Sequence, residues 1–361
     1  MFKRNLLCIL FFVVINVFAT KAQSAADSML AFFKANPNTT AITVIKNNTL
    51  LTNYNGNAIL PMAHTANWLV ALEYAKQATY NLIDTAERIN LKDVVKYYLN
   101  NPIQDTYEHW LASMLVQKKI VNNTVSLGQV VQGMIQYSAL AYSEYLMDKL
   151  GFDNIKSSTK SYNLTNHTVI LSPVGALALY QNRTNTSPKK ILSAISKMTE
   201  EQYCKLAFIM HSAIKNDSTF KDKMPKVPIN EASNYMWANK LPQGSTSSYA
   251  ALLLAILQQQ MLDAKYYVML KAIVEPLLSS NSINKTYSRY AVNNSITTNT
   301  IAYSQFVRNE TDSYLIVYFL SKPNANNKAK LLQWQPTFNV SVLHNIAFTL
   351  QLKQLKKGDF K

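Results

Sequence analysis

The stretch Leu60-Pro-Met-Ala-His64-Thr-Ala-Asn67-Trp-Leu-Val-Ala-Leu-Glu73 decides how the rest of the chain is interpreted. It passes from a proline and small residues into an apolar run with the spacing of a helix. His64 and Asn67 stand three residues apart at the start of this run, so a helix places both side chains on one face. Polar groups at the beginning of a helix also lie near backbone N–H groups that have no partner within the helix.

The residues before this stretch predict one helix and a hairpin. Residues 24–36 have helical spacing, and Pro37 ends the helix. The segments 41–46 and 49–54 are strand-like and are joined by Asn47-Asn48. Asparagine tolerates positive φ, which a tight turn between two strands requires.

After the opening stretch the apolar spacing stays mostly helical to about residue 280. Ser126 and Gln129 form a capping box at the start of one helix. Gly151 suits the C-terminal end of another, since glycine readily adopts positive φ. This long block predicts an all-helical lobe.

Strand patterns return late, at about 286–296, 300–307 and 313–321, and a final amphipathic helix is expected from about Ser341 to Leu355. Strands interrupted by a helical insertion predict an α+β fold, with an antiparallel five-stranded sheet flanked by helices beside the helical lobe. We expect one domain over 23–361, with an α/β lobe over 23–63 and 281–361 and the helical lobe over 64–280.

Two further stretches hold candidate residues. The first is Gly133-Met-Ile-Gln-Tyr-Ser138-Ala-Leu140-Ala-Tyr-Ser-Glu-Tyr-Leu-Met-Asp-Lys-Leu-Gly151, in which a loop precedes a helix. The second is Tyr290-Ala-Val-Asn293-Asn-Ser295-Ile-Thr297, in the first of the three late strands.

Taken in order, these three stretches resemble the serine β-lactamase and penicillin-binding-protein family, class A β-lactamases in particular. The resemblance spans about residues 40–322 and implies a β-lactamase/transpeptidase-like fold with a cleft between the lobes. The family writes its first motif as Pro-x-Ala-Ser-x-x-Lys, its second as Ser-x-Asn and its third as Lys-Thr/Ser-Gly. The resemblance implies acyl transfer from a β-lactam or peptide amide to the serine of the first motif.

Most of the residues that carry this chemistry in the family are replaced here. His64 stands at the position of the nucleophilic serine, and Asn67 at that of the lysine. Ser138 is retained, whereas Leu140 replaces the asparagine of the second motif. Asn293 and Ser295 replace the lysine and the glycine of the third.

The glutamate that activates the deacylating water in class A enzymes also has no counterpart. From Asn154 to Thr199 the chain contains no Asp or Glu. We therefore name no catalytic residue; the motif-equivalent positions are His64, Asn67, Ser138, Leu140, Asn293 and Ser295. Of these we expect His64, Asn67, Ser138, Leu140 and Asn293 to converge in the cleft.

The N-terminus predicts export. Lys3 and Arg4 precede an apolar run over residues 6–19 that ends in small residues, which is typical of a secretory signal peptide over residues 1–22. Cleavage after Ala19 and cleavage after Ala22 are both compatible with the sequence. The run is too short for a comfortable transmembrane helix, and no transmembrane segment is expected later. We expect a periplasmic or secreted protein.

Removal of residues 1–22 takes away three cations and no acid, which lowers the formal net charge from +16 to +13. This charge suits an anionic surface, whereas scattered lysines and export argue against nucleic acid. Cys204 is the only cysteine left, so no intramolecular disulfide is expected. His64, His109, His167, His211 and His344 lack metal-ligand spacing, and no phosphate or dinucleotide motif is present. No metal or cofactor is expected.

These observations leave three functions open. The first is a catalytically inactive relative of the serine hydrolases, a pseudoenzyme, that binds a cell-wall fragment, a peptide or a protein in the vacated cleft. The second is an active β-lactam or peptide-amide hydrolase with an atypical site. The third is a non-enzymatic exported protein that binds through its basic surface alone.

Overall fold

The computed structural model describes residues 25–99, 106–181, 186–217, 219–220, 223, 229–260 and 263–355. Its central element is a five-stranded antiparallel sheet in the order β2-β1-β9-β8-β7. The strands are β1 (Thr40–Lys46), β2 (Thr49–Tyr54), β7 (Arg289–Ile296), β8 (Thr300–Arg308) and β9 (Ser313–Ser321). The predicted α+β fold with this sheet is confirmed.

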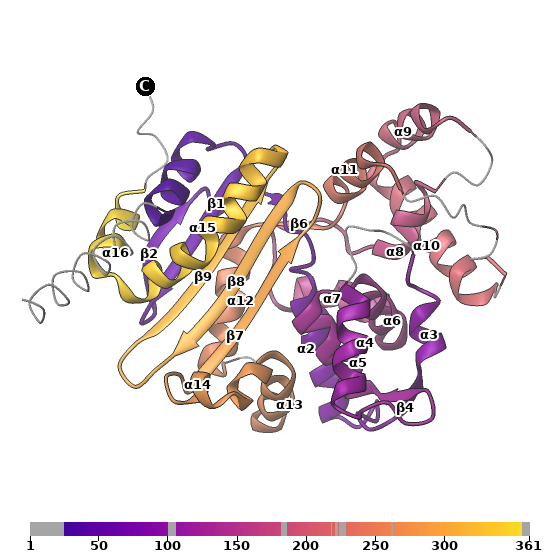
Figure 1. Ribbon diagram of the computed structural model, residues 1–361, viewed down its shortest axis with the longest axis horizontal. Coiled ribbons are helices and arrows are strands. Elements are labelled where there is room, and N and C mark those ends of the chain that lie inside the picture. Colours follow the sequence, from indigo (N-terminus) through magenta and orange to yellow (C-terminus); the bar gives the residue numbers. More distant parts are fainter. Residues whose placement is uncertain are drawn as a thin grey trace, which may run out of the picture.

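One face of the sheet is covered by the helices near the two ends of the chain (Figure 1). These are a helix over residues 25–35, α15 (Ala325–His344) and α16 (Ile346–Lys353). Phe33, Phe338 and Phe348 pack there against Ile42 and Tyr318 of the sheet in one hydrophobic cluster. Burial of apolar side chains on both partners holds this layer together.

The prediction of one final helix over about 341–355 is wrong. The structure has two helices, and α15 begins at Ala325, where Asn324 caps it by accepting a hydrogen bond from the backbone of Asn327. Pro336 lies inside α15, a position where proline usually interrupts a helix. Asn345 ends α15 and caps α16, because its side chain accepts a hydrogen bond from the backbone N–H of Phe348.

The opposite face of the sheet packs on α12 (Thr246–Gln258), which lies behind the strands in Figure 1. The Thr246 hydroxyl is 2.9 Å from that of Thr43 on β1. Phe319 and Leu315 of β9 join a hydrophobic cluster that continues into the helical lobe. Although α12 lies within residues 64–280, it is thus a layer of the sheet sandwich.

The helical lobe stands to one side of the sheet (Figure 1). Helices of 5 to 17 residues dominate it, and their apolar faces form the larger of the two hydrophobic clusters. They are α2 (Asn67–Thr79), α3 (Leu91–Val95), α4 (Thr106–Val116), α5 (Leu127–Tyr137), α6 (Leu140–Leu150), α7 (Phe152–Ser161), α8 (Pro173–Ala178), α9 (Pro188–Ser196), α10 (Glu200–Asn216), α11 (Glu231–Asn239) and α13 (Ala264–Val274).

Short elements connect these layers. Two small antiparallel pairs are β3 (Leu60–Pro61) with β6 (Gln243–Gly244), and β4 (Arg88–Asn90) with β5 (Thr124–Ser126). The 3₁₀ helix η2 (Pro276–Ser279) and the single turn α14 (Asn281–Asn284) lead back to the sheet. The strand expected from about residue 286 begins at Arg289, because the backbone N–H groups of Thr286 and Tyr287 still bond to Ile283 in a helical turn.

Several local predictions are confirmed. Asn47 and Asn48 both have positive φ in the β1–β2 turn. Ser126 and Gln129 form the capping box of α5, and Gly151 follows α6 with φ of 90°. Cys204 is buried as a free thiol.

The predicted signal peptide over residues 1–22 lies outside the described residues. Within the described part of the chain, no helix combines the length and the apolar character that crossing a bilayer requires.

Candidate ligand-binding site

The segment before α2 is held against the sheet by hydrogen bonds. The backbone N–H of His64 donates to the hydroxyl of Ser295 on β7 at 2.7 Å. One turn later the indole of Trp68 donates to the hydroxyl of Ser304 on β8 at 2.8 Å. Ala63 has φ of 48°, a backbone conformation that costs a non-glycine residue about 1 kcal/mol or more. These contacts fix where the side chains of His64 and Asn67 lie.

His64 is a buried imidazole whose pKa falls to about 4, because burial disfavours the charged form more than a hydrogen bond to the backbone of Ser138 favours it. Nε2 has no hydrogen-bond partner among the described residues. At neutral pH His64 is therefore a neutral imidazole with one ring nitrogen left unpaired.

Asn67 lies at the start of α2 and presents the opposite group. Its Oδ1 accepts a hydrogen bond from the hydroxyl of Ser143 on α6 at 3.0 Å. This bond identifies Nδ2 as the remaining amide group, and Nδ2 has no partner in the described part of the chain. Asn67 thus offers unused N–H donors.

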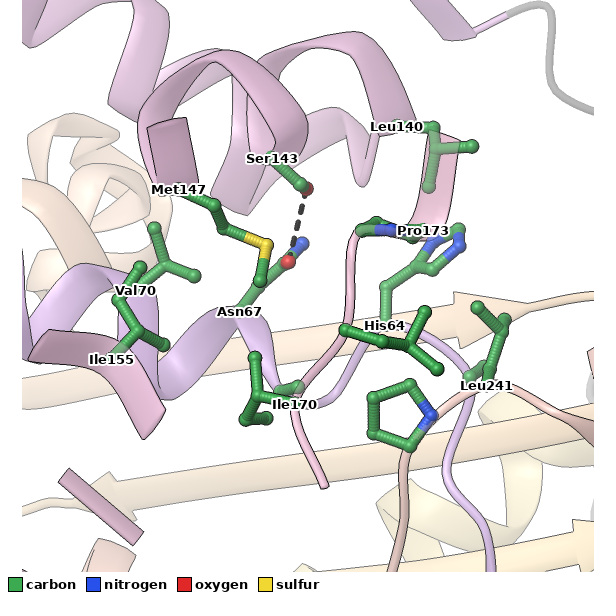
Figure 2. Close-up of a pocket in the computed structure, with 14 residues that line it drawn as sticks. His64, Asn67, Val70, Leu140, Ser143, Met147, Ile155, Ile170, Pro173 and Leu241 are labelled. Carbon is green, nitrogen blue, oxygen red and sulfur yellow. Dashed lines mark hydrogen bonds between the residues drawn. The ribbon is translucent and has the colours of Figure 1, made fainter. Parts of the chain in front are cut away.

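Both side chains line a small cavity between α2, α6, α7 and the segments before α8 and β6 (Figure 2). The cavity has a volume of about 30 Å³, room for about two water molecules. Apart from His64, Asn67 and Ser143, its walls are apolar. They are formed by Ala63, Ala66, Val70, Leu140, Met147, Ile155, Ile170, Leu171, Pro173, Leu241 and Pro242. None of the residues around the cavity carries a formal charge at neutral pH.

The loop between α5 and α6 closes the site from the side of the helical lobe. Ser138 ends α5 with φ of 51° and contacts His64 through its backbone. Leu140, the first residue of α6, contributes an apolar wall. The retained hydroxyl of Ser138 does not line the cavity, whereas the hydroxyl of Ser143, one turn along α6, does.

Strand β7 contributes Ser295 and Asn293 from one buried face. Ser295 contacts His64 as described. Asn293 is 1 % exposed, and neither polar atom of its side chain has a partner among the residues the structure describes. It pairs in register with Ser304, the residue that anchors Trp68.

The structure thus brings His64, Asn67 and Leu140 around one cavity and joins His64 to Ser138 and Ser295. Asn293 lies buried next to this group on β7. The sequence reasoning missed Ser143, although it stands on the helix that the second motif predicts. It also missed the walls from residues 155, 170, 171, 173, 241 and 242, because no local pattern links them to His64.

A second polar cluster lies beside the cavity. Glu144, fully buried on α6, accepts hydrogen bonds from the hydroxyl of Ser172 and from the backbone N–H of Val174 at 2.9 Å. His211 on α10 contacts Glu144 through Nδ1 at 2.5 Å and Asp148 through Nε2 at 3.2 Å. Lys215 and Tyr97 complete the surroundings of Asp148. This cluster fixes the start of α8, where Pro173 forms part of the cavity wall.

The charges in this cluster stabilise one another. Burial alone lowers the pKa of His211, but its hydrogen bonds with Asp148 and Glu144 outweigh burial and raise it to about 9. Burial raises the pKa of Asp148, but hydrogen bonds from His211 and Lys215 lower it to about 2. The imidazole is therefore a cation over most of the pH range, in contrast to that of His64.

Comparison with solved structures defines the fold as that of the class A β-lactamases. The chain is similar to a β-lactamase from Sphaerobacter thermophilus, with a TM-score of 0.51 and 12% identity over 89% of this chain and 97% of that one. It is similar to the extended-spectrum β-lactamase TLA-3, with a TM-score of 0.50 and 13% identity over 89% and 99% of the two chains. An acyl-enzyme complex of PBP-A with penicillin G gives a TM-score of 0.50 and 13% identity over 88% and 96%.

The sequence itself matches the β-lactamase enzyme family over residues 24–240. The chain therefore belongs to that family, and the predicted resemblance is confirmed. None of the curated proteins compared with the chain matches it.

Proposed function

We propose that this member of the β-lactamase family is a binding protein that does not perform acyl transfer. The start of α2 carries the proposal: a neutral imidazole and a carboxamide stand where the resemblance places the serine and the lysine. An amide such as that of Asn67 cannot accept a proton from a nucleophile. The imidazole of His64 would give at most an acyl-imidazole, which hydrolyses quickly.

The unused polar atoms of the cavity support a role in binding. An unpaired polar atom in a buried site costs about 1–3 kcal/mol, and Nε2 of His64 and Nδ2 of Asn67 are two such atoms on one cavity. A ligand that bonds to both recovers this energy. We propose a cell-wall fragment or a peptide as that ligand, since both present many neutral hydrogen-bonding groups.

We also propose that the protein acts outside the cytoplasm after residues 1–22 are removed. The basic, apolar and small-residue segments of the N-terminus support this. N-terminal sequencing of the protein recovered from the cell envelope or the medium should give a start at Thr20 or Gln23. A chain that retains Met1 would contradict the proposal.

A covalent-labelling experiment tests the absence of acyl transfer. The purified protein is incubated with excess penicillin G beside an active class A β-lactamase variant that traps the acyl-enzyme, and intact masses are measured. We expect no mass increase for this chain and a stoichiometric increase for the control. A stoichiometric adduct that maps to His64, Ser138 or Ser143 would establish the hydrolase instead.

The hydrolase stays the second candidate because one cavity holds both the hydroxyl of Ser143 and the free Nε2 of His64. A serine can act as a nucleophile when a base removes its proton. In this structure the Ser143 hydroxyl donates to Asn67, which is not a base.

Calorimetry with a soluble disaccharide-peptide fragment of peptidoglycan tests binding. Asn67→Leu, which keeps the side-chain size but removes the amide, should weaken binding at least tenfold. Asn326→Leu is the matched control, because Asn326 is exposed on α15 and far from the cavity in sequence. Equal affinities for the two variants would exclude the cavity as the binding site.

A further inference from the structure

The end of α4 and the loop after it expose apolar side chains to solvent. Leu115 is 60 % exposed, Val116 is 83 % exposed and Val121 is 53 % exposed. Lys118 and Lys119 stand between them and are exposed as well. We call these five residues the α4 tip. Single exposed apolar residues are common on protein surfaces, whereas apolar residues gathered in one place mark a surface that contacts a partner or a membrane.

Backbone hydrogen bonds hold the α4 tip together. The N–H of Lys119 donates to the carbonyl of Met114 at 2.9 Å, and Val121 and Thr124 exchange two such bonds at 3.0 and 2.9 Å. Arg88 on β4 donates from Nη2 to the carbonyl of Thr124 at 2.7 Å. The α4 tip is therefore fixed beside β4, which lies at the edge of the helical lobe (Figure 1).

The α4 tip and its surroundings carry positive charge. The sequence contains no Asp or Glu over residues 109–143. Arg88 and Lys92 add two exposed cations on β4 and α3. Of the acids next to them in sequence, Glu87 forms an ion pair of 2.8 Å with a lysine of α6, and Asp93 is half-buried. Clustered cations of this kind attract an anionic partner.

An anionic lipid bilayer matches both the charge and the apolar side chains. Each lysine close to negatively charged headgroups raises the affinity about fivefold. Apolar side chains gain further where they reach the boundary between headgroups and acyl chains. A soluble polyanion would bind the lysines but leave Leu115 and Val116 in water. The combination of the two kinds of side chain therefore favours the bilayer.

We propose that the α4 tip docks the protein on an anionic lipid bilayer. Leu115, Val116 and Val121 lie at the level where headgroups meet acyl chains, and Lys118 and Lys119 bind the lipid phosphates. The contact is peripheral, since no helix within the described residues is long and apolar enough to cross the membrane. This inference goes beyond the proposed binding function and does not depend on it.

Sedimentation with lipid vesicles tests the inference on the exported chain, whose start N-terminal sequencing gives. One set of vesicles contains phosphatidylcholine alone, and the other contains equal parts of phosphatidylcholine and phosphatidylglycerol. We expect at least tenfold tighter binding to the mixed vesicles at low salt, and weaker binding as salt screens the charges. Equal affinity for both kinds of vesicle, or no binding to either, would overturn the inference.

A matched pair of lysine variants separates the α4 tip from the net charge of the protein. Lys118→Gln with Lys119→Gln should weaken binding to the mixed vesicles at least tenfold. Lys189→Gln with Lys190→Gln removes the same charge from two exposed neighbours on α9 and should weaken binding less than twofold. Equal losses would mean that binding follows net charge alone, and the α4 tip would have no special part in it.

A second matched pair tests the apolar contact. Leu115→Ser with Val116→Ser should weaken binding to the mixed vesicles at least threefold, because less apolar surface leaves water. Ile346 and Leu350 on α16 are 79 % and 55 % exposed, and their replacement by serine should leave binding unchanged. Circular dichroism verifies that all variants fold. Unchanged binding of the α4 variant, or an equal loss in the α16 variant, would contradict the inference.

A fluorescent label shows whether the α4 tip enters the lipid. Cys204, which is buried, is replaced by alanine, and an environment-sensitive NBD group is attached to a cysteine in Val116→Cys or, as a control, in Ile346→Cys. Mixed vesicles should shift the emission of the first label to shorter wavelength and leave the second unchanged. Soluble polyphosphate should shift neither. Binding to vesicles without a shift at position 116 would assign the lysines to a headgroup or polyanion contact only.

The vesicle measurements are independent of the cavity at the start of α2. Asn67→Leu, expected to weaken the peptidoglycan fragment, should bind mixed vesicles like the unmodified protein. If the fragment binds while vesicles do not, the inference fails and the proposed function stands. If vesicles bind through the α4 tip while the fragment does not, the proposed function fails and the inference stands.

Discussion

Two neighbouring residues of α6 face two buried polar regions of opposite character. Ser143 points to the cavity beside His64 and Asn67, as Figure 2 shows for Ser143 and Asn67. Glu144 points to His211 and to the start of α8. In the cavity a buried imidazole is neutral and keeps a free nitrogen. In the Glu144 cluster a buried imidazole is charged and uses both nitrogens.

This difference in hydrogen-bond pairing suggests that the Glu144 cluster has a structural role and that the cavity beside His64 has a binding role. A buried polar network whose members are all paired fixes the positions of the elements that carry it. Polar atoms left unpaired on a cavity wall reduce stability unless something binds to them. We infer that the Glu144 cluster holds the site in place and that the cavity is the site itself.

Glu144→Ala should have the largest effect on stability. The substitution leaves the His211 cation, the Ser172 hydroxyl and the Val174 N–H without their buried partner. Removal of one member of a buried ion pair costs about 3–5 kcal/mol. Urea denaturation followed by circular dichroism measures the loss, and Glu310→Ala on the exposed β8–β9 turn should cost less than about 0.5 kcal/mol. Equal losses for both variants would contradict a structural role of the cluster.

The pH dependence of stability should follow the same cluster, with an effect of about 2 kcal/mol on each side. The pKa of His211 is raised to about 9, so its contribution is complete below about pH 6.5 and is lost as the pH rises through 9. The pKa of Asp148 is lowered to about 2, so its contribution is complete above about pH 4 and is lost as the pH falls through 2.

Thermal unfolding between pH 2 and pH 10 checks this expectation. Stability should be highest near pH 6.5, because below that pH the unfolded chain binds a proton at His64 that the folded protein, with a His64 pKa of about 4, does not. His211→Gln should flatten the alkaline decline, whereas His64→Gln should leave it unchanged because His64 is neutral throughout that range. An alkaline decline that survives in His211→Gln would assign it to other groups.

The smallest effect on stability is expected in the cavity. The double variant Asn67→Leu, Ser143→Ala replaces both partners of one hydrogen bond by apolar groups and removes the unpaired Nδ2. Such a replacement is nearly neutral or stabilises a protein by about 1 kcal/mol. The variant should therefore unfold at the same or higher urea concentration while losing affinity for the peptidoglycan fragment. A loss of more than about 2 kcal/mol would assign these residues to structural support.

The sequence predicted the fold better than it predicted the hydrogen bonding and protonation of these two polar regions. The three motif surroundings predicted the family, the sheet and the place of the cleft, because helical spacing, turn residues and strand runs are local patterns. They also predicted that His64, Asn67, Ser138 and Leu140 lie together. The sequence reasoning did not predict α15, which begins at Ala325. Pro336 lies inside this helix, and an internal proline normally indicates that a helix ends.

The sequence by itself thus determined the α+β class, the strands of the main sheet and the helical block between them. Only the tertiary structure decided the chemistry of those positions. Nothing local to His64 and His211 makes the first neutral and the second a cation; burial and contacts with distant residues do so. Glu144 and His211 meet across 67 positions of the chain. Protonation and hydrogen-bonding depend on the partners and the solvent that the whole fold leaves around a side chain.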